Sequence, residues 1–360
     1  MNTLPHPLPP GAFRPGVDHH GAFSRLARQL PEGALVLLDA KVARLHPGVE
    51  RALRARAPRR VLKIPGGERA KTMTRLEQVL IAGADLPRSG ALIAIGGGTI
   101  GDLGTVAAHL IKRGVSLHHV PTTVLAAVDS SLGGKGAVHV GVGDHLVKNL
   151  AGAFHSPEAC WICPEFFTTL TPEQIREGSV EAWKMALTLD AAIWDAWFRR
   201  PPALPRMIRE ARALKEAVCV ADPYEQQGLR RVLNFGHTFG HVLESVSEFR
   251  IHHGEAVGLG MRCALDVGRA LGITPVVVAD QVEAILDVRA QVLPRSVMAK
   301  WFRKIPATAI GKLLAADKKA GADGGLVMVL LEAPGATTAT SVTPRQWQAL
   351  YPAWQQGVRP

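Results

Sequence analysis

Short apolar runs alternate with amphipathic stretches over the first 165 residues of the chain. Two stretches, 71–86 and 101–114, have the pattern of helices. The intervening apolar runs have the length and composition of strands: Ala34–Ala40, Arg59–Pro65, Ala91–Gly98 and Ser116–Thr123. Strands that alternate with helices favour a parallel sheet with helices packed on it. We therefore expect residues 1–165 to form a Rossmann-like α/β domain.

From about Thr171 onward the strand pattern gives way to apolar residues at helical spacing. The segments with this spacing are Pro172–Asp190, Leu204–Asp222, Glu225–Val246 and Gly254–Gly272. A length of 360 residues is too great for one ordinary core and fits two domains. The predicted fold class is thus α/β followed by α, with a mostly helical domain over residues 166–360.

Composition narrows the class of protein. With 47% hydrophobic and 20% charged residues, the chain has the composition of a soluble globular protein. Its apolar runs are too short to span a bilayer and its N-terminus has no signal-peptide pattern, so we expect a cytoplasmic protein without membrane contact. The formal charge of +11 is dispersed along the chain and no nucleic-acid-binding motif is present. This favours attraction for small anions over binding of nucleic acid.

The cysteine pair Cys160 and Cys163 forms a C-x-x-C motif inside an apolar, strand-like run that ends at Pro164. No second C-x-x-C completes a four-cysteine zinc site, and a redox pair would be expected at a helix N-terminus. We therefore expect both cysteines to be buried and structural.

The glycine-rich segment Gly96–Asp102 directly follows the strand-like run that starts at Ala91, and a helix is expected to begin near Asp102. Backbone N–H groups at such a position can bind the pyrophosphate of a dinucleotide. A tight turn that binds nothing would use the same glycines, so the segment alone is a weak signal.

The segment Leu233–His241 carries candidate metal ligands. On one helix, the spacing would place Asn234, His237 and His241 on a single face. His252 and His253 follow, and Glu181 lies upstream, one turn before Lys184. Two histidines and a carboxylate with an open fourth position are typical of a catalytic zinc site. All these candidates belong to the helical domain, so we expect the metal to face the glycine-rich segment across an interdomain cleft.

In order along the chain, several motifs resemble those of 3-dehydroquinate synthase and its sugar-phosphate cyclase relatives. They are GGGTIGDLG, PTTVLAAVDSSLGGK, VKNLAGAFHSP, EAWK, GLRRVLNFGHTFGH, HHGEAVGLGM and DKK, and the resemblance extends from about Gly66 to Leu331. It implies an N-terminal Rossmann-like domain and a C-terminal helical domain in a homodimer. It also implies NAD and one Zn²⁺ or Co²⁺ as cofactors, and a sugar phosphate as the substrate.

The resemblance also assigns roles to individual residues. It makes Glu181, His237 and His253 the metal ligands, and it gives His241 to the substrate phosphate instead of the metal. Further substrate positions are Asp129, Lys135, Lys148, Asn149, Lys184, Lys215, Arg230, Asn234 and Lys319, with Arg113 reaching a phosphate from across the dimer. The implied NAD positions are Asp39, Glu68, Lys71, Gly97, Gly98, Asp102, Thr122 and Thr123, together with Lys135 and Lys148.

The implied reaction is that of the shikimate pathway of aromatic amino acid biosynthesis. It converts 3-deoxy-arabino-heptulosonate 7-phosphate to 3-dehydroquinate with loss of phosphate, and NAD is regenerated in each turnover. Arg230 favours this substrate because a guanidinium is the natural bidentate partner of a carboxylate.

Other reactions stay open. An aminodehydroquinate synthase, a valiolone-type cyclase and a metal-dependent polyol or glycerol-phosphate dehydrogenase are the alternatives. Two departures from the family pattern bear on the choice. The segment 136–147 is longer than in the family, and one extra residue separates Lys215 from Arg230.

Overall fold

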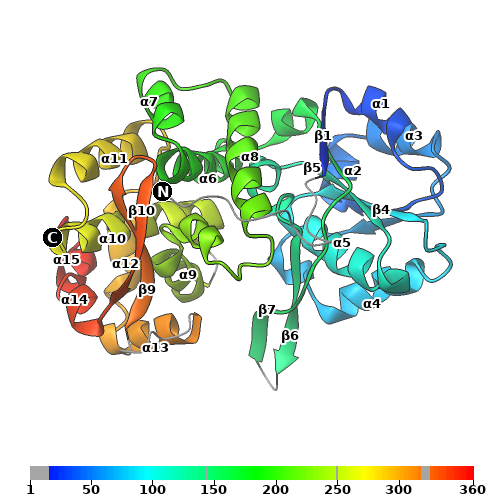
Figure 1. Ribbon diagram of the computed structural model, residues 1–360. Coiled ribbons are helices and arrows are strands. Elements are labelled where there is room, and N and C mark those ends of the chain that lie inside the picture. The colour runs from blue at the N-terminus through cyan, green and yellow to red at the C-terminus, as the bar shows by residue number, and fades with distance from the viewer. Residues whose placement is uncertain (1–15, 143–144, 249, 318–324) are drawn as a thin grey trace. The chain divides into compact units, whose positions relative to one another are not determined.

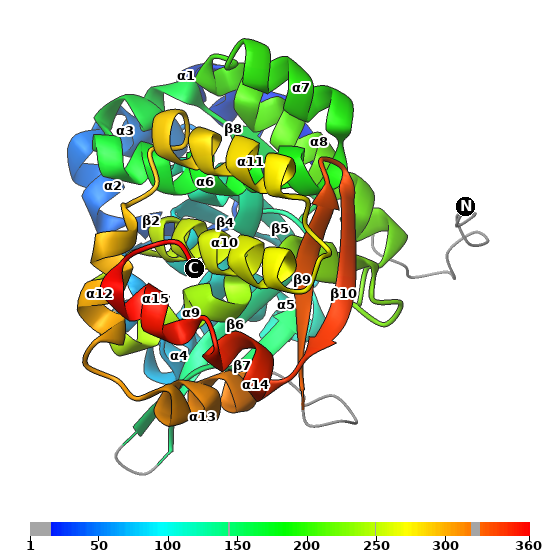
Figure 2. The same cartoon turned by 90° about the vertical axis from the view of Figure 1, so that its left-hand side faces the viewer.

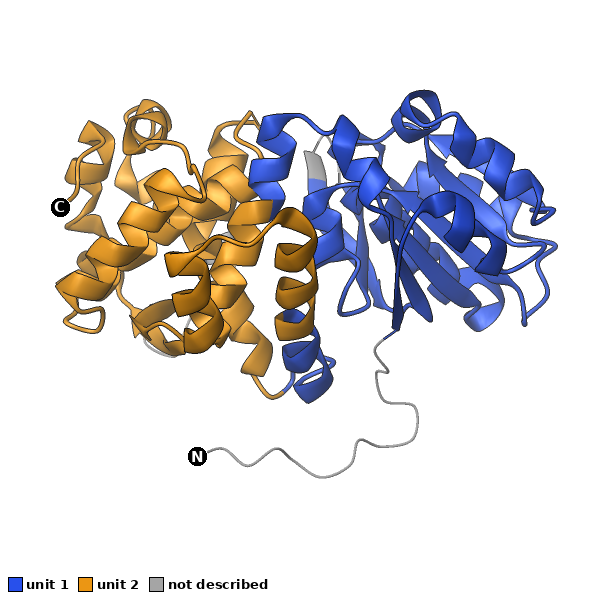
Figure 3. Ribbon diagram, turned by 90° about the horizontal axis from the view of Figure 1, so that it is seen from above, with its two compact units in different colours: residues 1–178, 215–226 blue, residues 179–214, 227–360 orange. Residues whose placement is uncertain are grey.

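The computed structural model describes residues 16–142, 145–248, 250–317 and 325–360. The chain forms two compact units (Figure 3): one comprises the residues up to Gly178 together with Lys215–Gln226, and the other comprises Ser179–Leu214 and Gln227–Pro360. The division at Gly178 differs from the boundary expected at residue 165. Segment 166–178 stays with the first unit because the ring of Phe166 packs at a tilt against that of Phe23 and because Gly178 lies against the backbone of Val124 and Leu125.

The first unit contains the expected parallel sheet (Figure 1). Its six strands lie in the order β1-β8-β5-β4-β2-β3, and every neighbouring pair is parallel. Their bounds are β1 Val17–His20, β2 Leu35–Asp39, β3 Arg60–Ile64, β4 Ala91–Gly96, β5 Ser116–Pro121 and β8 Ala159–Ile162. β2 and β4 are buried along their whole length, as their unbroken apolar runs require. The α/β prediction is confirmed.

Helical segments connect these strands, and one, η5, follows the last of them. They are α1 Phe23–Leu26, η1 Ala27–Gln29, α2 Ala40–Leu45, α3 Gly48–Arg54, η2 Glu68–Ala70, α4 Met73–Ala82, α5 Gly98–Leu110, η3 Ile111–Arg113, η4 Ala126–Ser130 and η5 Pro164–Thr169. The apolar faces of α4 and α5 pack on β2 and β4, with Leu76, Val79 and Leu103 almost completely buried. Outside the main sheet, β6 Lys135–Val142 and β7 His145–Phe154 form an antiparallel hairpin.

Both cysteines of the C-x-x-C motif are free and buried, one in β8 and one just after it. Burial raises the pKa of Cys163 far above the ordinary range of a thiol. The prediction that both cysteines are buried is therefore confirmed.

The second unit is mostly helical, as predicted (Figure 2). α6 Pro172–Leu189 and α8 Leu204–Ala221 each cross the division between the units. The other helices are α7 Ala191–Arg199, η6 Leu229–Asn234, α9 His237–Val246, α10 His253–Ala270, α11 Val276–Val288, α12 Arg295–Phe302, α13 Ala307–Asp317, α14 Pro344–Gln348 and α15 Tyr351–Gln356.

One antiparallel hairpin interrupts this helical pattern. It is formed by β9 Leu326–Ala333 and β10 Ala336–Val342, and β9 packs along α10. β9 has an almost continuous apolar run, which periodicity alone does not distinguish from a buried helix. In the described part of the chain, no helix has both the length and the apolar character needed to cross a membrane.

Candidate functional site

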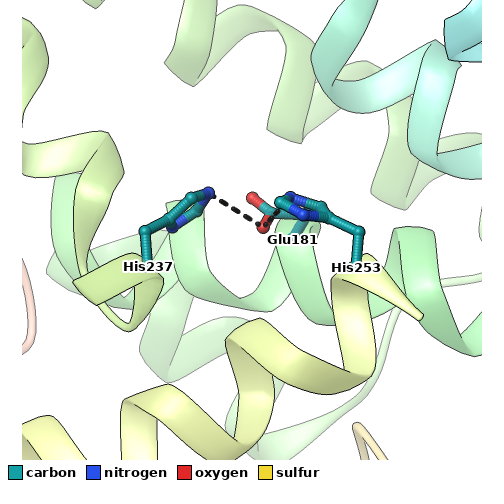
Figure 4. A group of neighbouring side chains, drawn as sticks. All are labelled: Glu181, His237 and His253. Atoms are coloured by element: carbon teal, nitrogen blue, oxygen red, sulfur yellow. Dashed lines mark ion pairs between the residues drawn. The ribbon is translucent and has the colours of Figure 1, made fainter. Parts of the chain in front are cut away.

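Three ligand-type side chains meet in the second unit (Figure 4): Glu181 of α6, His237 at the start of α9 and His253 at the start of α10. One ligand atom of each lies within 4.8 Å of the others. Oε1 of Glu181 is 3.7 Å from Nε2 of His237 and equally far from Nε2 of His253. Tetrahedral zinc with bonds of about 2.0–2.1 Å places its ligand atoms roughly 3.3 Å apart. The observed separations therefore suit a bound divalent ion with little rearrangement.

The burial of Glu181 and His237 favours binding of a cation. Glu181 is fully buried, and neither carboxylate oxygen meets hydrogen-bond geometry with a described donor. Burial holds the pKa of His237 well below its usual value, and the neighbouring Lys184, His253 and His241 lower it further. His237 is therefore neutral at neutral pH, which is the form that binds a metal. A buried carboxylate beside imidazole nitrogens is a donor set that Zn²⁺ and Co²⁺ accept.

Lys184 offsets part of the Glu181 charge. Its Nζ lies 2.5 Å from Oε2 of Glu181 and donates a hydrogen bond of 2.7 Å to the carbonyl of Leu233. The lysine thus contacts one carboxylate oxygen, while the other oxygen is the one nearest both histidines. The sequence placed these two residues one turn apart, and the structure agrees.

The second ring nitrogen of each histidine also has a neighbour. Nδ1 of His253 lies 3.4 Å from Oε1 of Glu244, and Nδ1 of His237 lies 3.3 Å from the carbonyl of Phe235. Such contacts place the proton on Nδ1 and leave the Nε2 lone pair for the metal. Glu244 was not predicted. Its signal was its position seven residues after His237, which puts both on one face of α9.

The single helix predicted over Asn234, His237 and His241 is wrong. The 3₁₀ helix η6 ends at Asn234, and Gly236, with φ of +81°, breaks the chain before α9 begins at His237. His237 and His241 do share a face, with ring centroids 5.4 Å apart. The break needs a glycine, because φ is positive there and a Cβ at Gly236 would lie 2.7 Å from the carbonyl of Val257 in α10.

Glycines set the separation between α9 and α10. A Cβ at Gly260 would overlap the carbonyl of Gly236 and lie 2.7 Å from the nitrogen of Gly240. A Cβ at Gly240 would in turn lie 3.2 Å from the Cα of Val257. Because His237 and His253 begin these two helices, the close packing of the helices fixes the separation of two candidate ligands.

The predicted nucleotide residues gather at the carboxyl ends of β2 and β4 in the first unit. Asp39 ends β2 and caps α2 by accepting a 2.7 Å hydrogen bond from the N–H of Lys41. Gly66 lies against its carboxyl group. The N–H of Thr122 donates to the carbonyl of Gly96 at 3.0 Å. Carboxyl ends of parallel strands are where such sheets bind ligands.

The helix after the glycine run starts earlier than predicted, at Gly98 and not near Asp102. Gly97 is its N-cap, and its carbonyl accepts hydrogen bonds from the N–H groups of Ile100 and Gly101. The glycines form the first turn because small residues are needed there. A Cβ at Gly97 would lie 3.3 Å from Thr123, and one at Gly98 would lie 3.2 Å from Ser130.

Charged side chains surround this helix start. Lys71 is buried, and its Nζ donates to Oδ2 of Asp102 at 2.5 Å. Burial raises the pKa of Asp102 to about 6, although Lys71 opposes the shift. Nζ of Lys71 also lies 3.6 Å from Oε1 of Glu68. Glu68, Lys71 and Asp102, which the resemblance assigned to NAD, therefore form one contact network.

Several predicted substrate residues of the first unit form ion pairs. Nζ of Lys215 donates to both the Oδ1 and the carbonyl of Asp129 at 2.6 Å, and Lys148 lies 3.7 Å from Glu68. Lys135 pairs with Glu225, a partner that the sequence did not indicate. Asn149 and Arg113 both have positive φ, and Arg113 is exposed.

The remaining predicted substrate residues belong to the second unit. Arg230, on η6, is 3% exposed, whereas Asn234 and His241 are half-buried. Lys319 lies outside the described residues.

Family models match most of the chain. The N-terminal model of 3-dehydroquinate synthase covers residues 61–177, and the C-terminal model covers residues 178–320. The chain belongs to the 3-dehydroquinate synthase family. It is therefore an enzyme of the sugar-phosphate cyclase group, and the predicted resemblance is confirmed.

Relatives in this family differ in substrate. The 3-dehydroquinate synthase of Chlorobium luteolum is 38% identical over 288 residues, which are 76% of this chain and 77% of that protein. The 2-epi-valiolone synthase of Actinosynnema mirum is 39% identical over 268 residues, 70% of this chain and 68% of that protein. Overall identity therefore does not separate the two activities.

Solved structures share the fold over nearly the whole chain. A 2-deoxy-scyllo-inosose synthase complexed with carbaglucose-6-phosphate, NAD⁺ and Co²⁺ has a TM-score of 0.80 at 25% identity, covering 95% of this chain and 96% of that one. The 2-epi-5-epi-valiolone synthase ValA of Streptomyces hygroscopicus, with NAD⁺ and Zn²⁺ bound, has a TM-score of 0.80 at 24% identity and 99% coverage of both chains.

Proposed function

We propose that this protein is a 3-dehydroquinate synthase of the shikimate pathway. It converts 3-deoxy-arabino-heptulosonate 7-phosphate to 3-dehydroquinate and releases inorganic phosphate, with NAD used catalytically. The proposal rests on the family and, within the family, on a single residue that bears on the identity of the substrate.

That residue is Arg230. Its guanidinium is buried, and it lies on the same short helix as Asn234, just before the metal-ligand candidate His237. A planar guanidinium binds a carboxylate through two parallel hydrogen bonds. The heptulosonate has a carboxylate, whereas sedoheptulose 7-phosphate and glucose 6-phosphate have none. A buried arginine at this position therefore supports the carboxylate-bearing substrate.

Glu181, His237 and His253 would hold one Zn²⁺ or Co²⁺. When bound, the ion supplies Lewis-acid chemistry at the substrate's hydroxyl and ketone oxygens. The protein's part is to keep the His237 imidazole neutral through burial and to place Lys184 beside Oε2 of Glu181.

The first unit would bind NAD, and when bound the cofactor would supply hydride-transfer chemistry at C5 of the substrate. Asp39 would accept hydrogen bonds from ribose hydroxyls. The helix start at Gly97 and Gly98 would offer N–H groups to the pyrophosphate. Glu68, Lys71, Asp102, Thr122 and Thr123 complete the proposed NAD site.

The remaining residues would bind the rest of the substrate. We assign the phosphate to Lys135, Asn234 and His241, which hold a dianion by charge-assisted hydrogen bonds. Once C5 is a ketone, the adjacent C–H is acidic, and the phosphate itself can take that proton as it leaves. Asp129, Lys148, Asn149, Lys184, Lys215 and Lys319 are assigned to the other polar groups of the substrate.

A homodimer is part of the proposal, with Arg113 reaching the partner's phosphate. Arg113 is exposed and has φ of +64° between Lys112, also at positive φ, and Gly114. An arginine held in this conformation at the surface is suited to contact a second copy of the chain.

A valiolone-type cyclase is the second candidate. It stays open because the Actinosynnema mirum enzyme is as similar to this chain as the 3-dehydroquinate synthases are, and because the β6–β7 hairpin contains the segment 136–147 that departs from the family pattern. This hairpin carries Lys148 and Asn149, so its length bears directly on the proposed substrate site.

Phosphate release from a panel of sugar phosphates decides between these functions. With NAD and Zn²⁺ or Co²⁺ present, we expect turnover of the heptulosonate without a net change in absorbance at 340 nm. Arg230→Lys and Arg230→Ala should each lower kcat/KM by roughly 30- to 1000-fold, the cost of losing a charge-assisted contact to a buried carboxylate. Preference of the wild type for sedoheptulose 7-phosphate would overturn the assignment. Build-up of NADH would indicate a dehydrogenase.

A further inference from the structure

The β6–β7 hairpin is irregular at His139. Val138 pairs with Ala151 and Val140 pairs with Val147, so the three residues 148–150 of β7 lie opposite His139 alone. β7 therefore bulges at this point, and the bulge carries Lys148 and Asn149. Bulges redirect side chains and are frequent beside active sites.

The imidazole of His139 fills the space that the bulge opens. The side chain is 1% exposed, and its Nδ1 accepts a 3.1 Å hydrogen bond from the backbone N–H of Asn149. The backbone N–H of His139 donates to the carbonyl of Lys71 at 2.8 Å. His139 thus contacts the bulge with its side chain and the segment after η2 with its backbone.

The other ring nitrogen lies against an acid. Nε2 of His139 is 3.2 Å from Oε1 of Glu68. Because Nδ1 accepts a hydrogen bond, a neutral ring must carry its proton on Nε2, on the side of Glu68. Burial lowers the pKa of His139, which favours this neutral form.

The same oxygen of Glu68 also attracts two lysines. Nζ of Lys71 lies 3.6 Å from it and Nζ of Lys148 lies 3.7 Å from it. Lys71 in turn donates to Asp102 at the start of α5. Glu68 therefore contacts both Lys148 of the bulge and Lys71 of the proposed nucleotide site.

We propose that His139 is a positioning residue that holds the β7 bulge, and with it Lys148 and Asn149, in register with Glu68. The roles of Lys148, Asn149 and Glu68 in binding substrate and NAD rest on the proposed function. His139 itself lies within segment 136–147, which is longer than in the family. We therefore attribute this positioning role to the longer hairpin.

Three substitutions separate the two contacts of the ring. His139→Leu removes both nitrogens at similar volume. His139→Asn keeps an acceptor near the place of Nδ1, and His139→Gln keeps a donor that reaches toward Glu68. His118→Leu is the matched control, because His118 is also a buried histidine of the first unit but contacts Ser116 and Trp161.

Amide hydrogen exchange at Asn149 tests the positioning without any substrate. We expect exchange to be at least about 10-fold faster in His139→Leu, since the amide loses its acceptor, and close to wild type in His139→Asn and in His118→Leu. Circular dichroism and the thermal midpoint show that each variant is folded. Unchanged exchange at Asn149 in folded His139→Leu would overturn the proposal.

Binding and kinetics test the consequence for the site. In His139→Leu we expect KM for the sugar phosphate to rise about 10-fold, and the Kd of NAD to rise by a smaller factor. His139→Gln should recover the NAD affinity and His139→Asn should recover KM. Wild-type KM and Kd in His139→Leu would reject the link to Lys148 and Glu68. If the wild type consumed no sugar phosphate, the proposed function would fail, and the exchange measurement would still decide the role of His139.

Discussion

The separation of α9 and α10 should control metal affinity, and Gly260→Ala tests this directly. Gly260 lies where α10 crosses the start of α9, and a Cβ there would overlap the carbonyl of Gly236 and lie 2.7 Å from the nitrogen of Gly240. Both atoms belong to backbone, which cannot swing away as a flexible side chain can. The added methyl must therefore move one helix relative to the other.

The size of the shift follows from contact distances. Non-bonded heavy atoms rest at about 3.5–4.0 Å, so relieving the contact with Gly240 requires a displacement on the order of 1 Å. Metal–ligand bonds tolerate only about 0.2 Å. Because His237 and His253 begin the two displaced helices, we expect metal affinity to fall about 10- to 100-fold, the range seen when ligand orientation is disturbed. Overpacking should also lower the free energy of unfolding by about 1–3 kcal/mol.

Competition with a calibrated chelator measures the affinity, and urea unfolding of the metal-free protein measures the stability. Gly240→Ala should have a smaller effect, since its Cβ would lie no closer than 3.2 Å to α10. Gly311→Ala on α13 is the control. Its nearest neighbour would be Trp347 at 3.7 Å, so it should leave metal binding unchanged and, as a helical glycine replaced by alanine, should not destabilise the protein. Wild-type metal affinity in folded Gly260→Ala would refute the reasoning.

Two further predictions concern Glu244 and Asp102. Glu244→Gln removes the charge beside Nδ1 of His253 and should weaken metal binding about 10-fold, as measured by chelator competition. Glu248→Gln is the control, because Glu248 is an exposed acid just after the same helix and its loss should not change metal affinity. Equal metal affinities in the two variants would contradict the role of Glu244. Because the pKa of Asp102 in the folded protein is about 6, above the ordinary value of about 3.9, the folded state binds a proton more tightly. Stability should therefore fall as pH rises from about 4 to about 6 and level off above that. Asp102→Asn should remove this pH dependence, so the free energies of unfolding of the variant and the wild type, measured in urea, should change differently between pH 4.5 and 7. Parallel pH profiles of the two proteins would contradict the prediction.

Periodicity and residue type were enough to predict the parallel sheet and the mostly helical second unit, whereas the metal-ligand set also needed the family resemblance. Strands such as Leu35–Asp39 and Ala91–Gly96 are buried on both faces, so they appear in the sequence as continuous apolar runs. Residue type and spacing indicated Glu181 and His237, since few residue types bind zinc, and the family resemblance added His253 in place of His241. Such properties belong to the residues themselves and do not depend on their neighbours in space.

Tertiary contacts decided the rest. The break at Gly236 lies against the carbonyl of Val257, and the helix start at Gly97 and Gly98 lies against Thr123 and Ser130. Periodicity reveals none of these contacts. His139 and Glu244 lack a motif of their own, because each acts through a residue distant in sequence or on another element. The sequence by itself thus determined the fold class and, through the family resemblance, which side chains can bind a metal. Only the packed structure decided where helices begin and which groups orient the ligands, because both depend on steric and hydrogen-bond contacts between segments far apart in the chain.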